Sequence, residues 1–96
     1  MVEKAIIIRQ NRQYFDEHSF AEIKIWKIPK DKNRPHGFKY SLVYIKNEKR
    51  IIGYDNSEGK GDHRHYEDIE QSYFFKNIDT MIEDFNNDVK RCRNEN

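Results

Sequence analysis

The sequence predicts an α+β fold: a mainly antiparallel sheet of about four to six strands, with a C-terminal helix packed on one face. Short alternating segments typical of strands occupy most of the chain, and one amphipathic stripe follows near its end. Six Tyr, six Phe and one Trp supply large apolar side chains to a chain that is 35% hydrophobic and 36% charged. Each aromatic side chain can bury roughly 150–250 Å², enough for one core. We therefore expect a single domain, residues 1–96.

The first part of the chain predicts two strands. Residues 2–9 contain a β-branched run, and residues 20–28 alternate between two apolar faces. Residues 10–19 are polar and are predicted to form a turn or loop. Residues 29–37 contain both prolines and are also predicted to be a loop.

The middle of the chain predicts a hairpin. Residues 38–46 alternate strictly, and a tight turn at residues 47–49 leads to a strand at 50–55. Residues 57–61 are expected to be a loop. Two short strands are predicted at residues 63–66 and 73–75, separated by an acidic turn.

The C-terminal helix is predicted by apolar residues spaced three and four apart, with Asn77 as its N-cap. The stripe consists of Ile78, Met81, Ile82, Phe85, Val89 and Cys92. Acidic residues precede basic ones along this segment, which complements the helix dipole.

Charge is unevenly distributed, although the net charge is only +1. Residues 24–39 contain six basic residues and one acidic residue and suit phosphate groups, whereas residues 67–88 contain seven acidic residues and one basic residue. Lys30 and Arg34 are therefore predicted to bind RNA phosphates. The alternative is that both stretches are merely solvated faces.

Cysteine usage and hydropathy narrow the class of protein. Cys92 is the only cysteine, so an intramolecular disulfide is excluded, and we expect a buried, inert thiol. No apolar run approaches the roughly 18 residues that a membrane span needs, and no signal-peptide core is present. These observations predict a cytoplasmic protein without a membrane partner.

Residues 53–65 combine glycines with many groups capable of chemistry, namely Asp55, Asn56, Lys60, Asp62, His63, Arg64 and His65. Gly59 and Gly61 flank Lys60 and favour a tight loop that can approach a phosphate. On an extended strand, the imidazoles of His63 and His65 would point the same way, about 6.5–7 Å apart, and Arg64 would face the other side.

Three interpretations fit this segment. The first is metal-independent RNA cleavage, in which His63 and His65 act as general acid and base and Lys60 or Arg64 stabilises the transition state. The second is a metal-dependent hydrolase or nucleotidyl-transfer site on Asp55, Asp62, His63 and His65. The third is a structural turn in a module that only binds protein or nucleic acid. We favour the first, with no cofactor, and expect that fewer than three of the four metal-ligand candidates converge.

These residues also carry a resemblance to a known family. The run from His36 to Tyr44, the run from Arg50 to His65, the following aromatic segment and the helix motif at residues 84–89 resemble TumE-type toxins of bacterial type II toxin–antitoxin modules. Residues 22–29 fit the same pattern. Positions that match the motif are His36, Tyr40, Gly53, Tyr54, Asp55, Asn56, Gly59, Lys60, Gly61, Asp62, His63, Arg64 and His65.

The resemblance implies a small toxin made beside a helix-turn-helix antitoxin that binds and neutralises it. Ribonuclease activity is an expectation by analogy with other small toxins. We accordingly add Asn56, His36 and Tyr40 to Lys30 and Arg34 as candidate substrate-binding residues, and Asp55 and Asp62 to the candidate catalytic group.

Overall fold

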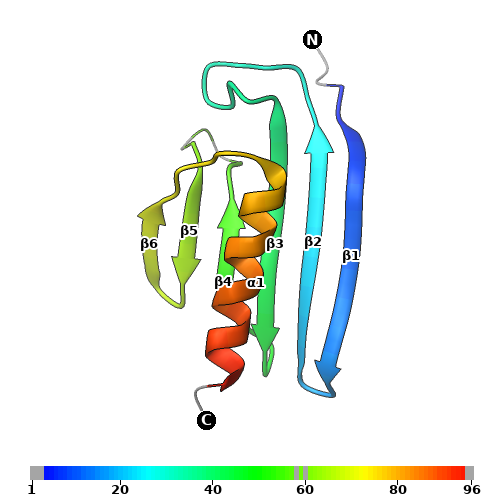
Figure 1. Ribbon diagram of the computed structural model, residues 1–96, viewed down its shortest axis with the longest axis vertical. Helices are drawn as coiled ribbons and strands as arrows, with labels where there is room; N and C mark the ends of the chain where they lie inside the picture. The colour runs from blue at the N-terminus through cyan, green and yellow to red at the C-terminus, as the bar shows by residue number, and fades with distance from the viewer. Residues whose placement is uncertain (1–3, 58, 60, 95–96) are drawn as a thin grey trace.

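The computed structural model describes residues 4–57, 59 and 61–94. These residues form a six-stranded antiparallel sheet in the order β1-β2-β3-β4-β5-β6, with one helix, α1, on one side (Figure 1). The predicted α+β class is confirmed. The elements are β1 (Ile6–Asp16), β2 (Ser19–Lys27), β3 (Phe38–Lys46), β4 (Lys49–Asp55), β5 (His63–Tyr66), β6 (Ile69–Ser72) and α1 (Ile78–Asn94).

Strand β1 is longer than predicted. Residues 10–16, expected to be a loop, continue the strand and pair with β2 as far as Asp16↔Ser19. Nearly every residue of β1 is exposed, because the strand forms an edge of the sheet. Polar side chains there stay in contact with water, so they cost little free energy of folding. The polar composition that predicted a loop is therefore equally typical of an exposed edge strand.

Strands β2, β3 and β4 match their predicted positions closely. The turn between β3 and β4 has two residues, Asn47 and Glu48, with φ of 52° and 66°, as in a type I′ hairpin. An irregularity in the β3–β4 register follows Tyr44, so that Ile45 lies opposite Arg50 while Tyr44 lies opposite Ile52. Such a bulge changes which β4 side chains share a face.

The last strand differs from the prediction. β6 consists of Ile69–Ser72, whereas residues 73–75 lie in the connection to α1. Two aromatic residues of this connection, Tyr73 and Phe75, anchor it instead of extending the sheet, whereas Phe74 is exposed. The Tyr73 hydroxyl donates to Asp84 Oδ2 at 2.6 Å, and the Phe75 ring lies 4.0 Å from that of His36.

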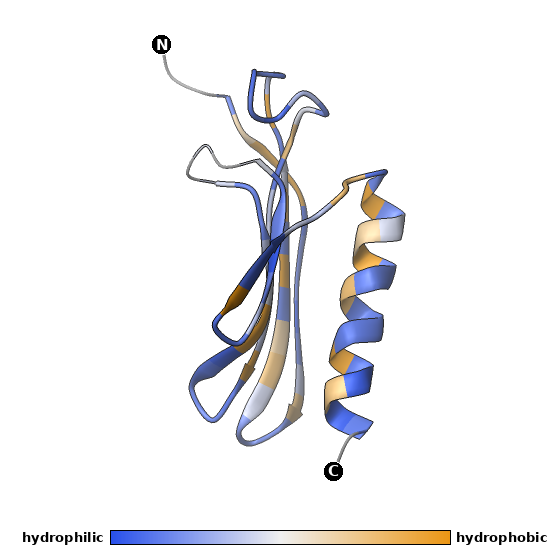
Figure 2. Ribbon diagram, turned by 90° about the vertical axis from the view of Figure 1, so that its left-hand side faces the viewer, coloured by the Kyte–Doolittle hydropathy of each residue, from blue (hydrophilic) through white to orange (hydrophobic). Residues whose placement is uncertain are grey.

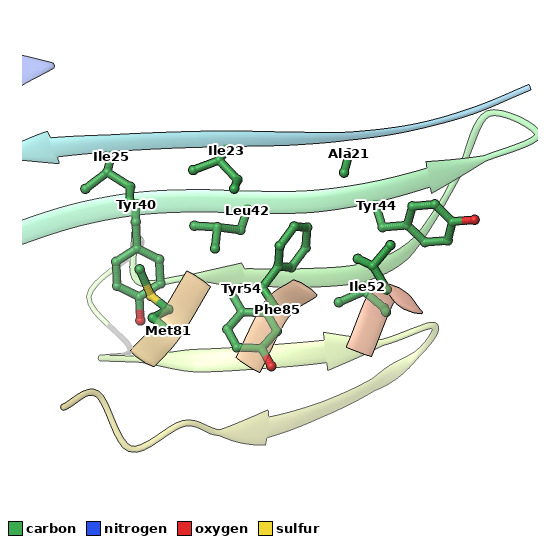
Figure 3. Close-up of a cluster of buried hydrophobic side chains, with 11 residues drawn as sticks. Ala21, Ile23, Ile25, Tyr40, Leu42, Tyr44, Ile52, Tyr54, Met81 and Phe85 are labelled. Carbon is green, nitrogen blue, oxygen red and sulfur yellow. The ribbon is translucent and has the colours of Figure 1, made fainter. Parts of the chain in front are cut away.

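Helix α1 and the sheet enclose the core. The Thr80 amide donates to Asn77 Oδ1 at 2.7 Å, which confirms the predicted N-cap. Met81, Phe85 and Val89 of the helix are buried, and Figure 3 shows how Phe85 and Met81 meet the side chains of the sheet. The sheet contributes Ala21, Ile23, Ile25, Tyr40, Leu42, Tyr44, Ile52 and Tyr54.

The other side of the sheet carries no helix in the described part of the chain (Figure 2). We call this side the open face. Strand alternation and register place on it Phe20, Glu22, Lys24, Trp26, Lys39, Ser41, Val43, Ile45, Arg50, Gly53, Asp55, His63 and His65. Among the described residues, no helix combines the length and apolarity required to cross a membrane.

Candidate active site

Asp55, His63 and His65 meet on the open face. Asp55 ends β4, and the chain returns through a loop in which Gly59 and Gly61 have φ of 70° and 79°. The returning strand β5 pairs Asp55 with His63 and Gly53 with His65. Because the three residues share one face, their side chains form a compact cluster, which we call the Asp55 centre.

One carboxylate contacts both imidazoles of the Asp55 centre. Asp55 Oδ1 lies 2.9 Å from His63 Nε2, and Oδ2 lies 3.6 Å from His65 Nε2. The two rings are 4.9 Å apart edge to face, closer than the strand rise predicted, because both lean toward Asp55. One ligand atom from each residue lies within 4.8 Å of the others. Three of the four metal-ligand candidates thus lie close together. Whether three of them bind one ion at about 2.0–2.2 Å, which was not expected from the sequence, is a question for experiment.

His63 is a buried strand residue, and each of its ring nitrogens contacts an oxygen atom of the protein. It is 4% exposed, and its Nδ1 lies 3.1 Å from the Gly61 carbonyl oxygen. Since a carbonyl oxygen only accepts, Nδ1 carries the hydrogen. Nε2 then faces the Asp55 carboxylate.

His65 is the more accessible imidazole of the Asp55 centre. Burial lowers the pKa of His65, and the nearby charge of Arg50 lowers it further, against the opposing effect of Asp55. The neutral ring is thus favoured. A neutral imidazole nitrogen can accept a proton or bind a cation.

Arg50 is a member of this region that the sequence did not reveal. A Cβ at Gly53 would lie 3.0 Å from Arg50 Cδ, so the side chain of Arg50 crosses the sheet where residue 53 has none. The bulge after Tyr44 is what places Arg50 and Gly53 on the same face. A glycine inside a predicted strand was the available signal, since it often marks a close approach.

Asp62 belongs to a different cluster, on the helix side of the sheet. Its Oδ1 accepts hydrogen bonds from the Tyr40 hydroxyl at 2.6 Å and from Asn56 Nδ2 at 3.3 Å, and lies 3.0 Å from His36 Nε2. Burial, followed by the bond to Asp62, raises the pKa of Tyr40. Three predicted substrate-binding residues, His36, Tyr40 and Asn56, thus gather here.

The remaining predicted site residues are scattered. Arg64 faces α1, donating to the Tyr54 hydroxyl at 3.4 Å and lying 3.8 Å from Asp88. The guanidinium of Arg34 is held by Asp31 at 2.8 Å, and Lys30 is exposed in the same loop. Lys60 lies outside the described residues.

Comparison with known proteins agrees with the motif found in the sequence. The family model described as Toxin TumE matches residues 3–93, nearly the whole chain. No curated protein and no solved structure matches the chain. On the extent of the family match, the chain belongs to the TumE toxin family.

Proposed function

We propose that this TumE-family toxin acts by cleaving RNA, with Asp55, His63 and His65 at the reacting phosphate. The observation that carries the proposal is the convergence of one carboxylate and two imidazoles on a sheet face without a covering helix in the described chain. Groups that titrate near neutrality suit proton transfer at a phosphodiester. An uncovered face also admits a polymeric substrate.

The proposed reaction is transesterification within the RNA strand. The ribose 2′-oxygen attacks the adjacent phosphorus, and the bond from phosphorus to the 5′-oxygen breaks. A base at the Asp55 centre removes the 2′-OH proton, and the leaving 5′-oxygen gains a proton. The products are a 2′,3′-cyclic phosphate and a 5′-hydroxyl. His65, as the accessible imidazole, is essential to this scheme.

The open face offers a path for the rest of the strand. Register places Lys24, Ser41, Asp55 and His63 in one row across β2 to β5. Beside that row, the ammonium group of Lys39 lies 5.6 Å from the Trp26 ring centre. A cation beside an aromatic ring suits phosphates and stacked bases together. We propose that single-stranded RNA lies over Lys24, Trp26 and Lys39 on its way to Asp55.

Cleavage of a labelled single-stranded RNA by the purified protein tests the activity. We expect His65→Gln and Asp55→Asn each to lower the rate by roughly 10²–10⁴, the usual effect of losing a proton-transfer group. His18→Gln, at an exposed turn, should cleave at the normal rate. Single-stranded DNA of the matching sequence should stay intact, because it lacks the 2′-hydroxyl that attacks phosphorus. Equal rates for His65→Gln and wild type, with both proteins folded, would refute the proposal.

Growth of cells tests the same assignment in vivo. Expression of the protein alone should inhibit growth, and His65→Gln should relieve the inhibition at equal protein level. His63→Ala is a poorer variant, because the buried ring also holds Gly61 and Asp55 in place. Full toxicity of folded His65→Gln would show that the Asp55 centre is not the source of toxicity.

We also propose that a helix-turn-helix antitoxin binds and neutralises the toxin. The proposal follows from membership of the toxin family and is tested through the neighbouring gene. Its product should co-purify with the toxin and restore growth. A neighbouring product that does neither would exclude this partner.

A further inference from the structure

We propose that the Asp55 centre binds one divalent transition-metal ion through Asp55, His63 Nε2 and His65 Nε2. The binding site is inferred from geometry alone, whereas its catalytic use rests on the proposed RNA cleavage. Four features of the centre support it: the tautomer of His63, the separations of the ligand atoms, the kind of donors, and the contrast with the second His–Asp cluster.

The hydrogen bonding of His63 leaves Nε2 free to act as an acceptor beside a carboxylate. Nδ1 donates to the Gly61 carbonyl, so a neutral ring presents a bare Nε2 to Asp55 Oδ1 at 2.9 Å. Two acceptors at this distance require a positive charge held by both, which is either a second ring proton or a cation. Histidines that bind metals commonly donate their other N–H to a backbone carbonyl, as His63 does.

The separations match those of ligands around one ion. Two ligands about 2.1 Å from an ion lie roughly 3.0 Å apart at a right angle and roughly 3.4 Å apart at a tetrahedral angle. The two Asp55–imidazole separations are 2.9 and 3.6 Å. All three ligand atoms lie within 4.8 Å of one another, so the widest pair would have to approach by at most about 1.4 Å to reach the tetrahedral separation.

The donors define the class of ion. Two imidazole nitrogens and one carboxylate oxygen suit borderline ions such as Zn²⁺ and Mn²⁺, whereas Mg²⁺ prefers oxygen ligands. Three protein ligands also leave coordination positions for water or a phosphate oxygen.

The cluster around Asp62 shows what a His–carboxylate pair looks like when the protein itself satisfies it. There the carboxylate receives hydrogens from Tyr40 and Asn56 in addition to its contact with His36. In the described part of the chain, the direct contacts of the Asp55 carboxylate are with two imidazoles. The unfilled charge at Asp55 is thus available to a cation.

An ion at this position gives the proposed cleavage its base. Water bound to such an ion loses a proton near neutral pH, and the resulting hydroxide can take the 2′-OH proton. The ion also offsets the negative charge that develops on the phosphoryl oxygens. With the ion bound, the base at the Asp55 centre would be the ion-bound hydroxide, and His65→Gln would lower the cleavage rate by weakening the hold on the ion.

Calorimetric titration of the full chain with ZnCl₂, MnCl₂ and MgCl₂ tests the site directly. We expect one Zn²⁺ or Mn²⁺ per chain and much weaker Mg²⁺ binding. His65→Gln and Asp55→Asn should weaken Zn²⁺ binding by more than about tenfold, the loss that even outer-shell changes cause. His18→Gln should bind normally. No binding, or loss of binding in His18→Gln alone, would overturn the site.

Imidazole ¹⁵N spectra provide a second measurement on the unaltered protein. Zinc should shift Nε2 of His63 and of His65 and leave His36 unchanged. Shifts confined to His36 or His18 would overturn the assignment. Zinc binding without RNA cleavage would refute the proposed function and leave the site standing. Undiminished cleavage by protein shown to be metal-free would remove the catalytic role of the ion and leave the ribonuclease standing.

Discussion

Asn56 illustrates how one side chain can extend a sheet beyond the end of a strand. It is 1% exposed, its Nδ2 donates to the Phe38 carbonyl at 2.8 Å, and its Oδ1 accepts from the Tyr40 amide at 3.2 Å. The side chain thus pairs with β3 where the backbone of β4 has ended. Its role in the described structure is that of a ladder residue, and substrate binding by Asn56 stays a prediction.

We expect Asn56→Ala to lower the free energy of unfolding by about 2–3 kcal/mol, because it leaves two buried backbone groups of β3 unpaired. Urea denaturation measures this change. Asn86→Ala, at an exposed helix position, serves as the control and should change stability little. A near-zero effect at Asn56 would mean that water replaces both bonds.

The environment of His65 predicts how the protein responds to pH. Its pKa lies below the ordinary 6.5, so the neutral ring persists into more acidic solution. Activity that needs neutral His65 should fall only as pH drops below that lowered pKa. Arg50→Gln removes a repulsive charge and should raise the pKa of His65, moving the acid limb of the pH profile upward.

NMR titration of the His65 ring checks this shift directly, with Lys49→Gln as a matched loss of charge in the same strand. If Arg50→Gln leaves the His65 titration where it was, burial alone sets the pKa.

Sequence reasoning selected the candidate site residues apart from Arg50, but did not show how they group. Asp55 and Asp62 looked equivalent, since each lies near the two histidines in the chain. Strand register separates them, placing Asp55 with His63 and His65 and sending Asp62 to His36. Residue spacing gives the faces within one strand. It does not tell which side of the sheet a loop residue reaches after a turn.

At the scale of elements, Phe85 joins α1 to the sheet through an aromatic contact. Phe85 is fully buried, and its ring meets Tyr54 edge to face at 5.8 Å (Figure 3). Phe85→Ala should destabilise the protein by about 3–5 kcal/mol through lost burial and the resulting cavity. Thermal and urea unfolding measure the loss. Glu83→Ala, at an exposed position of α1, should cost far less.

The elements that the sequence predicted well are those with a buried face. β2, β3, β4 and α1 alternate or repeat because one side of each packs into the core. β1 and β6 are exposed, so most of their residues are polar because they face solvent, and this composition gives little sign that they pair in a sheet. The aromatic residues 73–75 suggested a strand, although Tyr73 and Phe75 anchor a connection and Phe74 is exposed.

For the whole molecule, the proposed RNA path predicts that residues away from the Asp55 centre bind RNA without taking part in its cleavage. A double variant, Lys24→Ala with Lys39→Ala, should weaken RNA binding and reduce its dependence on salt, because fewer counterions are released. Fluorescence anisotropy at several salt concentrations measures both effects. Lys90→Ala, on α1, should bind RNA normally. Unchanged binding by the double variant would place the path elsewhere, with the loop residues Lys30 and Arg34 as the next candidates.

The outer edge of β1 also affects how a free chain behaves in solution. Ile6, Ile7 and Ile8 are about half exposed or more, on a strand that pairs with β2 on one side only. An edge of this length with exposed isoleucines is a template on which a second copy can add its own strand, and such stacking leads to aggregation. We therefore expect a chain made without the proposed antitoxin to be prone to pairing with other copies along this edge.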